Sequence, residues 1–359
     1  MEQRFFVNYT IGKGAFLKFN EICRPLGRNV LILGGKKALN ASIDKLKDAI
    51  DNQFNIIDTA IYGTECCDIA VQRLFEKYKN EKIDFIVGVG GGKAIDTSKY
   101  LADVMCIPVV TVPTIASTCA ASSALSVVYT ENHAFQCFRR YNKPAYHCFI
   151  DTSVISNAPS YYFRAGLGDT LAKYYEVEFS SRGRIKTYSD EMGISISRMC
   201  NEPLLSIGKK ALDDCINHKL SDEFHQAVLI ITVSTGMVSM LINEEFNGAM
   251  AHALFYGFTT IEGFEEKFLH GDVVGYCTGV QAILDGKENE AKKILDFLRS
   301  IGVETTLSQR GIPVDREYLD GVLKSTLNDP DMKTIPYEIT EEMIFNAILK
   351  TEEMEVKTI

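Results

Sequence analysis

The feature that most constrains the fold is an apolar run that passes through three consecutive glycines into a helical pattern. Residues 84–89 read Asp-Phe-Ile-Val-Gly-Val, glycines occupy 90–92, and a helical pattern begins at Lys93. A strand that ends in glycines and opens a helix collects unpaired backbone N–H groups and the positive end of the helix dipole at one point. That arrangement suits a diphosphate, because a backbone without a Cβ can approach a ligand closely. The alternative is a tight turn with no ligand.

The segments around this loop alternate between short apolar runs and amphipathic stretches, which is typical of strands and crossover helices in a parallel sheet. A β-hairpin is expected at 124–131 and 135–141. The predicted strands are 29–33, 55–58, 84–89, 107–114 and 146–151, and the predicted helices are 41–52 and 68–79.

The hydrophobic pattern of the sequence changes after about residue 150, where long helical periodicities replace the strand-like runs. Three of them cover residues 167–180, 204–218 and 221–243, and a Pro- and Ser-containing break lies at 157–160. We therefore predict two domains. They are an α/β domain with a largely parallel, Rossmann-like sheet over residues 1–153, and an all-α domain over residues 154–359.

Charge and composition exclude several functional classes. The net charge of -9 and the pI near 5.3 argue against a nucleic-acid or anionic-membrane partner, which would require a positive surface. The first residues do not resemble a signal peptide, and no stretch has the roughly 20 uninterrupted apolar residues needed to span a bilayer. The 10 cysteines are scattered, so reduced thiols are favoured over disulfides. We therefore expect a cytoplasmic protein.

A second loop strengthens the prediction of a dinucleotide site. The segment Pro-Thr-Ile-Ala-Ser-Thr at 113–118 follows the next predicted strand, so its hydroxyls should lie at the same carboxyl edge of the sheet as the glycines. The glycine loop itself is neither a GxGxxG fingerprint with an acid behind it nor a Walker loop, because no Gly-Lys-Ser/Thr follows.

Three residues in the helical half are candidate metal ligands: Asp169, His252 and His270. A lone histidine on an apolar helix face is more often a hydrogen-bonded core residue than a ligand, and the three lie too far apart in the chain for spacing to decide. Two imidazoles and a carboxylate would nevertheless suit Zn²⁺ or Fe²⁺ and would leave positions open for a substrate oxygen.

Taken together, these segments resemble the glycerol dehydrogenases of the iron-containing, group III alcohol dehydrogenase superfamily, whose fold is shared with dehydroquinate synthase. The resemblance runs from about residue 9 to residue 275. It implies that Asp169, His252 and His270 bind the metal, with Zn²⁺ expected and Fe²⁺ as the alternative. It also implies a homo-oligomer. The implied cofactor-binding residues are Gly35, Lys36, Gly90, Gly91, Gly92, Lys93, Asp96, Thr114, Ser117, Thr118, Ser123, Leu125, Val127 and Tyr129.

The chain departs from the family pattern at three places. Cys119 replaces an Asp near the substrate, which weakens the case for glycerol itself, and it either assists catalysis or fills space. Phe255 replaces a second histidine of the metal helix, so the pocket should be more apolar. After the predicted strand at 29–33, the chain reads Gly34-Gly35-Lys36-Lys37 where NAD-preferring members carry an acid, so we predict that NADP(H) is accepted or preferred.

The resemblance implies a metal-dependent oxidoreductase that transfers a hydride between NAD or NADP and a small alcohol or its carbonyl form, in a site closed between the two domains. No protein general base is evident, so the proton would leave through water or the cofactor ribose. Three alternatives stay open: a glycerol-1-phosphate dehydrogenase that uses the basic residues Arg139, Arg140 and Lys143, a cyclase of the dehydroquinate synthase type, and a non-catalytic cofactor-binding relative.

Overall fold

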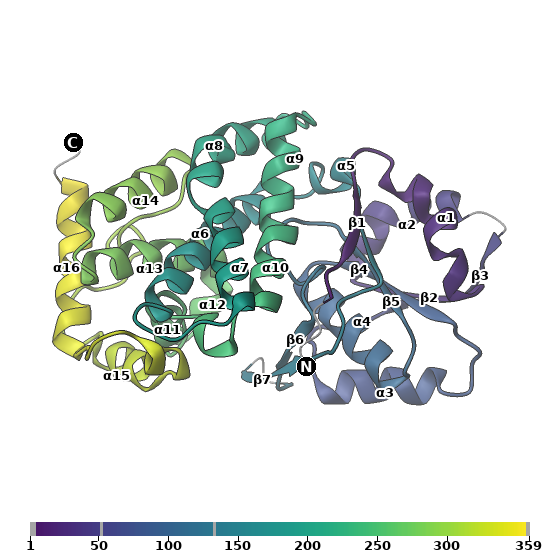
Figure 1. Ribbon diagram of the computed structural model, residues 1–359, viewed down its shortest axis with the longest axis horizontal. Helices are drawn as coiled ribbons and strands as arrows, with labels where there is room; N and C mark the ends of the chain where they lie inside the picture. Colours follow the sequence, from purple (N-terminus) through teal and green to yellow (C-terminus); the bar gives the residue numbers. More distant parts are fainter. Residues whose placement is uncertain (1–4, 51–52, 132–133, 357–359) are drawn as a thin grey trace. The chain divides into compact units, whose positions relative to one another are not determined.

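The computed structural model describes residues 5–50, 53–131 and 134–356, and the chain divides into two compact units (Figure 1). Unit 1 comprises Met1–Ser160 and Asp214–Met240, and unit 2 comprises Tyr161–Asp213 and Leu241–Ile359. The end of the helix predicted over 41–52 lies outside the described residues at positions 51 and 52.

Unit 1 is built on a six-stranded sheet with the strand order β1-β8-β5-β4-β2-β3, and all of its pairings are parallel. Its strands are β1 (Asn8–Ile11), β2 (Asn29–Gly34), β3 (Asn55–Ile61), β4 (Phe85–Gly90), β5 (Val109–Pro113) and β8 (His147–Ile150). The predicted α/β class with a largely parallel sheet is therefore confirmed. The edge strand β1 was not predicted, because its four residues contain no continuous apolar run.

Helices cover both faces of this sheet, as the alternation of side chains along its strands requires. Successive strand residues point to opposite faces. Val30 and Ile32 of β2 therefore join the core beneath α1 and α2, whereas Leu31 and Leu33 join the core beneath α3 and α4 (Figure 1). These helices are α1 (Phe19–Cys23), α2 (Lys36–Ile50), α3 (Asp68–Tyr78) and α4 (Gly92–Val104).

The predicted hairpin is present and forms a separate two-stranded sheet. It consists of β6 (Leu125–Tyr129) and β7 (Phe135–Arg140), which pair antiparallel. Its connection to the parallel sheet is the loop that follows β5, and this loop contains the predicted cofactor segment 113–118. The hairpin is therefore placed to carry residues such as Leu125 and Tyr129 close to the glycine loop.

One long helical segment groups with unit 1, although the sequence placed it in the helical half. It contains α9 (Asp222–Leu229), a π-helical stretch (Ile230–Ser234) and α10 (Thr235–Leu241). Ser122 Oγ donates to the carbonyl of Thr232, and Thr152 Oγ1 lies 3.1 Å from His225 Nε2. Such tertiary contacts decide the grouping, and the helical periodicity carries no information about them.

The same segment, Asp222–Leu241, is long and apolar enough by length and composition to span a membrane. It is the one such helix in the described part of the chain, and 61% of its most apolar window is buried within the protein. A core helix meets the same criteria, so the finding is weak support for a membrane span.

Unit 2 is helical, and no strand occurs among its described residues, which confirms the predicted all-α class. Helix α6 begins at Ser160, earlier than its periodicity predicted, because Gly166 and Gly168 interrupt the apolar pattern. The helices are α6 (Ser160–Ser180), α7 (Tyr188–Ser197), α8 (Glu202–Ile216), α11 (Met250–Phe258), α12 (Phe264–Lys267), α13 (His270–Leu284), α14 (Glu288–Ser300), α15 (Asp320–Asn328) and α16 (Glu341–Val356).

Candidate cofactor edge and metal centre

The glycine loop of unit 1 joins the carboxyl end of β4 to the first turn of α4. Gly91 is the N-cap of this helix, and no side chain caps its free N–H groups. Gly90 has a φ of +152°, and a Cβ added there would lie 2.7 Å from the Cβ of Ala94. Both the backbone conformation and the packing therefore require glycine, and the open helix end is available to an anionic ligand.

Two neighbouring loops meet the glycine loop at this edge of the sheet. The N–H of Thr114 donates to the carbonyl of Gly90 at 3.0 Å. The N–H of Gly35 donates to the carbonyl of Val89 in β4 at 3.4 Å. A Cβ added to Gly92 would lie 3.4 Å from Thr118 Oγ1. The structure thus brings these predicted residues together at the carboxyl edge, where open parallel sheets bind their ligands.

Lys93 extends from the first turn of α4 and is held by two groups. It forms an ion pair with Glu65, whose side chain is only 4% exposed, and its Nζ lies 5.4 Å from the ring centre of Tyr129. The Lys93 side chain itself is 49% exposed. A buried carboxylate therefore anchors a cation that remains open to solvent beside the glycine loop, a contact that the sequence reasoning missed.

Asp96 and Lys99 form a buried ion pair, which differs from the direct cofactor contact predicted for Asp96. Asp96 Oδ1 lies 2.8 Å from Lys99 Nζ, and Asp96 Oδ2 accepts from the N–H of Val127 at 3.1 Å. Lys99 Nζ also donates to the carbonyls of Ala120, at 2.8 Å, and Leu125. Burial raises the pKa of Asp96, although Lys99 opposes that effect. The pair fixes the loop after β5 and the start of the hairpin to α4.

The remaining predicted cofactor residues lie on the loop and hairpin that this ion pair holds. Ser117 is partly buried, and Leu125 and Val127 belong to β6. Ser123 Oγ is buried and has no hydrogen-bond partner among the described residues. Lys36 is exposed in the first turn of α2, close in sequence to Gly35.

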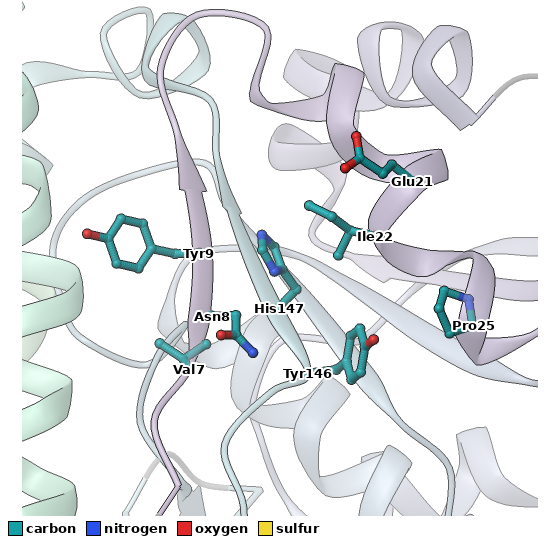
Figure 2. Close-up of a pocket in the computed structure, with 8 residues that line it drawn as sticks. All are labelled: Val7, Asn8, Tyr9, Glu21, Ile22, Pro25, Tyr146 and His147. Atoms are coloured by element: carbon teal, nitrogen blue, oxygen red, sulfur yellow. The ribbon is translucent and has the colours of Figure 1, made fainter.

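A shallow hollow in unit 1 contains none of the predicted site residues. It lies beside the edge strand β1, and Figure 2 shows Asn8, Tyr9, Glu21, Tyr146 and His147 around it. Asn8 and His147 begin their strands, so the hollow is at the amino end of β1 and β8. Ligands of parallel sheets bind at the opposite, carboxyl edge.

The three predicted metal ligands, from three different helices of unit 2, come together. Asp169 is in α6, His252 is in α11, and His270 is the first residue of α13. Asp169 Oδ1 lies 3.6 Å from His252 Nε2 and 3.3 Å from His270 Nε2, and one ligand atom from each residue lies within 4.8 Å of the others. Within the described part of the chain, this is the one such group of three histidine, cysteine or acidic residues.

A buried carboxylate orients His252 from the other side of its ring. Glu176 is fully buried, and its Oε2 lies 2.6 Å from His252 Nδ1. Its Oε1 accepts from the backbone N–H groups of Ala249, at 3.0 Å, and His252, at 2.8 Å. An Nδ1–H that donates to Glu176 leaves the lone pair on Nε2 free for a cation, which is the usual arrangement behind a metal-binding histidine.

The electrostatics of this group favour positive charge. Burial alone would raise the pKa of Asp169, but hydrogen bonds from His252 and His270 outweigh it and lower the pKa well below its usual value. Burial alone would lower the pKa of His252, but Glu176 and Asp169 raise it to about 10. A divalent cation fits this donor set, with two imidazole nitrogens, one carboxylate oxygen and a second carboxylate behind them.

Phe255 packs against the metal ligands and does not stand in an open pocket. Its ring centre lies 4.3 Å from that of His270, nearly perpendicular to it, and the residue is 2% exposed. The His270 side chain is 40% exposed, whereas Asp169 and His252 are 16% and 17% exposed. The cluster is therefore reached from the His270 side, and Phe255 supplies an apolar wall for that imidazole.

Glu176 was missed in the sequence, although a signal for it exists. It follows Asp169 by seven residues, which is two turns of an α-helix, so the two carboxylates lie on one face of α6. An acid two turns after a candidate ligand, on the same face of the helix, would have indicated a second acidic group at the same centre.

A parallel sheet with an open glycine loop, together with a helical unit that gathers two histidines and a carboxylate, fits a metal-using dehydrogenase with a dinucleotide cofactor. Comparison with known proteins agrees. Residues 7–152 match the family model described as iron-containing alcohol dehydrogenase. The chain belongs to the iron-containing alcohol dehydrogenase family and is a metal-dependent, NAD-dependent alcohol oxidoreductase.

Several relatives are similar over nearly the whole chain. Hydroxycarboxylate dehydrogenase A of Escherichia coli is 30% identical, over 96% of this chain and 95% of its own. A glycerol dehydrogenase of Citrobacter freundii is 29% identical, over 95% and 94%. The crystal structure of glycerol dehydrogenase from Schizosaccharomyces pombe is 27% identical and superposes with a TM-score of 0.89, over 99% of this chain and 92% of that one.

Proposed function

We propose that the enzyme interconverts a small alcohol or polyol with its carbonyl form, using a divalent metal bound by Asp169, His252 and His270. The observation that carries this proposal is the approach of three ligand atoms from three helices to within 4.8 Å of one another. A cation held there would act as a Lewis acid on the substrate oxygen. Zn²⁺ is proposed as the metal, with Fe²⁺ as the alternative.

The chain's own residues prepare this centre before any ligand arrives. Glu176 fixes the tautomer of His252, and Phe255 fixes the ring of His270 by edge-on packing. The burial of Asp169 and Glu176 makes their charge effective, because few waters screen it. Preorganised ligands lose little freedom when they bind a cation, and this favours tight retention of the metal.

For the cofactor, we propose that the diphosphate binds the N–H groups at the start of α4. Gly91, Gly92 and Lys93 would contact it directly, with Gly35, Gly90, Thr114 and Thr118 shaping the edge. The nicotinamide would lie along Ser117, Ser123, Leu125, Val127 and Tyr129. Asp96 contributes by holding Val127 and Lys99 in place.

We further propose that NADP(H) is accepted and preferred. The first turn of α2 begins with Lys36 and Lys37 and contains no acidic residue. Two lysines at the positive end of a helix dipole are unfavourable unless an anion is present, and a 2′-phosphate would supply one. Catalytic efficiency measured with both cofactors tests this point, and a strong preference for NAD would refute it.

The names of the relatives refer to different small hydroxy compounds, so the substrate has to be identified by assay. The test is a panel of glycerol, vicinal diols, hydroxyketones, small aldehydes and hydroxy acids, assayed with protein that is stripped of metal and reloaded with Zn²⁺ or Fe²⁺. Turnover of a polyol pair that requires the metal is the expected result. Equal activity in the stripped protein would refute the proposed role of the cluster.

Cys119 is proposed to fill space and to narrow the choice of polyol. If the lost acid matters for glycerol, Cys119→Asp should raise kcat/KM for glycerol relative to a simple alcohol, whereas Cys119→Ser should leave this ratio unchanged. A loss of all turnover in Cys119→Ser would instead indicate a direct catalytic role for the thiol.

The glycerol-1-phosphate alternative finds little support in the hairpin cations. Arg139 pairs with Asp103 at 2.6 Å and lies 4.2 Å from the ring centre of Tyr100, and Lys143 lies 4.7 Å from the ring centre of Phe5. These residues are engaged within the protein. A cyclase would require a Gly-His-x-x-Gly-His segment, and the chain has Tyr256 where the second histidine of that segment would stand. A homo-oligomer, a cytoplasmic location and the absence of nucleic-acid and membrane partners remain predictions.

A further inference from the structure

The helices α6 and α13 touch each other through their backbones immediately beside two metal ligands. A Cβ added to Gly168 would lie 2.4 Å from the carbonyl oxygen of Gly271, and one added to Gly271 would lie 1.9 Å from that of Ala165. Gly168 directly precedes Asp169, and Gly271 directly follows His270. Any shift between these two helices therefore changes the distance between the two ligands.

One partly buried ion pair ties the two helices together at this contact. Arg164 Nε lies 3.2 Å from Asp272 Oδ1, and an Arg164 terminal nitrogen lies 2.6 Å from Asp272 Oδ2, so the pair is bidentate. The Asp272 side chain is 7% exposed. Arg310 also donates to the main-chain carbonyl of Asp272 at 3.3 Å. Both the side chain and the backbone of the first turn of α13 are thus held from α6 and from Arg310.

A second pair ties the same two helices at their far ends. Arg182, just beyond α6, binds Asp285 at the end of α13 through two contacts of 2.8 and 2.7 Å. The Asp285 side chain is also 7% exposed, and the exposures of Arg182 and Arg164 are 35% and 30%. Both are bidentate arginine–aspartate pairs with similar exposure, but Arg182 also binds Glu178, and Asp285 also binds Lys287. The second pair lies farther along the helices from the metal ligands.

We propose that the Arg164–Asp272 pair positions Asp169 and His270, so that it sets the affinity of the cluster for its cation. Arg164 precedes Asp169 by five residues in α6, and Asp272 follows His270 by two in α13. A bidentate pair has a fixed geometry, and ligand sites tolerate displacements of only about 0.5 Å. The inference rests on the metal ligands proposed above, and it assigns the pair a role beyond general stability.

The test measures Zn²⁺ affinity by chelator competition for Arg164→Gln and Arg182→Gln, with urea unfolding of the metal-free proteins alongside. Arg164→Gln should weaken Zn²⁺ binding by about 10- to 100-fold, as expected when an outer support of a metal site is lost. Arg182→Gln should change it by less than about threefold, although it removes ion pairs with both Asp285 and Glu178. The loss of a positive charge relieves Coulomb repulsion and would by itself tighten Zn²⁺ binding, so a weaker affinity in Arg164→Gln identifies positioning.

Arg164→Lys provides a rescue test, because it keeps the charge but loses the fork that binds both carboxylate oxygens. Its Zn²⁺ affinity should fall between those of the wild type and Arg164→Gln, and it carries the test if Arg164→Gln does not fold. Unchanged or tighter binding in the folded Arg164 variants, or an equal loss in Arg182→Gln, would overturn the inference. His270→Ala is measured alongside, since unaltered Zn²⁺ affinity there would refute the metal assignment itself.

Discussion

The cofactor edge of unit 1 and the metal cluster of unit 2 are assembled in different ways. Most of the candidate cofactor groups come from one stretch, residues 90–129, in which two loops and a hairpin follow each other along the chain. The metal ligands come from three helices, and about 100 residues separate Asp169 from His270. The first site is encoded by local sequence and sheet topology, whereas the second depends on how helices pack.

This difference predicts where each site is vulnerable. The glycine loop offers backbone N–H groups to its ligand, so replacing a single side chain beside it should change cofactor binding only modestly. The metal cluster needs several helices at fixed separation, so losing a ligand or separating two helices should have large effects.

His270→Ala should have the largest effect, because it removes one of the three ligands that the described residues bring together at this site. We expect Zn²⁺ affinity to fall by more than about 1,000-fold, beyond the 10- to 100-fold loss typical of an outer partner, and turnover to be abolished. Cofactor binding, measured by fluorescence titration, should be unchanged. His225→Ala, in unit 1, is the control and should retain its metal. Full metal content in His270→Ala would contradict the assignment.

Gly271→Ala tests the helix contact beside the metal. Its Cβ would lie 1.9 Å from a backbone oxygen, which cannot move aside as a side chain can. We expect a loss of about 3 kcal/mol in the free energy of unfolding, measured with urea. Gly321→Ala in α15 is the matched control, since nothing lies within 4 Å of the added Cβ. Alanine there should stabilise the protein by up to about 1 kcal/mol, and equal destabilisation by both would refute the argument from packing.

Glu176→Gln tests the tautomer of His252. With its oxygen still accepting from the backbone, the new amide would present an N–H to His252 Nδ1, which favours a proton on Nε2 and removes the lone pair that a cation needs. We expect Zn²⁺ affinity to fall by about 10- to 100-fold with little change in folding. Glu178→Gln, two residues further along α6, should have no effect on the metal. Similar affinities for the two variants would refute the role of Glu176.

Lys93→Gln should have the smallest effect. Lys93 is half exposed and acts beside several backbone N–H groups, so we expect the KM for the cofactor to rise about fivefold, in line with the loss of roughly 1 kcal/mol. Zn²⁺ affinity should not change. The surface variant Lys47→Gln is the control. A loss as large as that in His270→Ala would mean that the cofactor edge depends on single side chains, against the contrast drawn above.

The same contrast explains what could be predicted from the sequence. The parallel sheet, the hairpin at β6 and β7 and the helical character of unit 2 follow from periodicity and turn residues, and all were predicted. The edge strand β1 was missed because it is short and half exposed, and its pairing with β8 is a tertiary event. Likewise, residues 214–240 group with unit 1 through contacts such as Ser122 with Thr232, which leave no local pattern.

For the site, the residue types were predictable, but their supporting partners were not. Asp169, His252 and His270 were identified through a family resemblance, because their spacing alone carries no signal. Glu176 could have been found from its two-turn spacing after Asp169. The partners of Arg164 and Lys93, namely Asp272 and Glu65, lie on other elements, and only the packed structure brings them together.

The most direct test of the metal centre is a crystal structure of the active, zinc-loaded enzyme with anomalous diffraction recorded at the zinc absorption edge. We expect one strong peak about 2.0–2.2 Å from Asp169 Oδ1, His252 Nε2 and His270 Nε2. A fully active enzyme whose zinc peak lies elsewhere, with these three side chains bound to no metal, would contradict it.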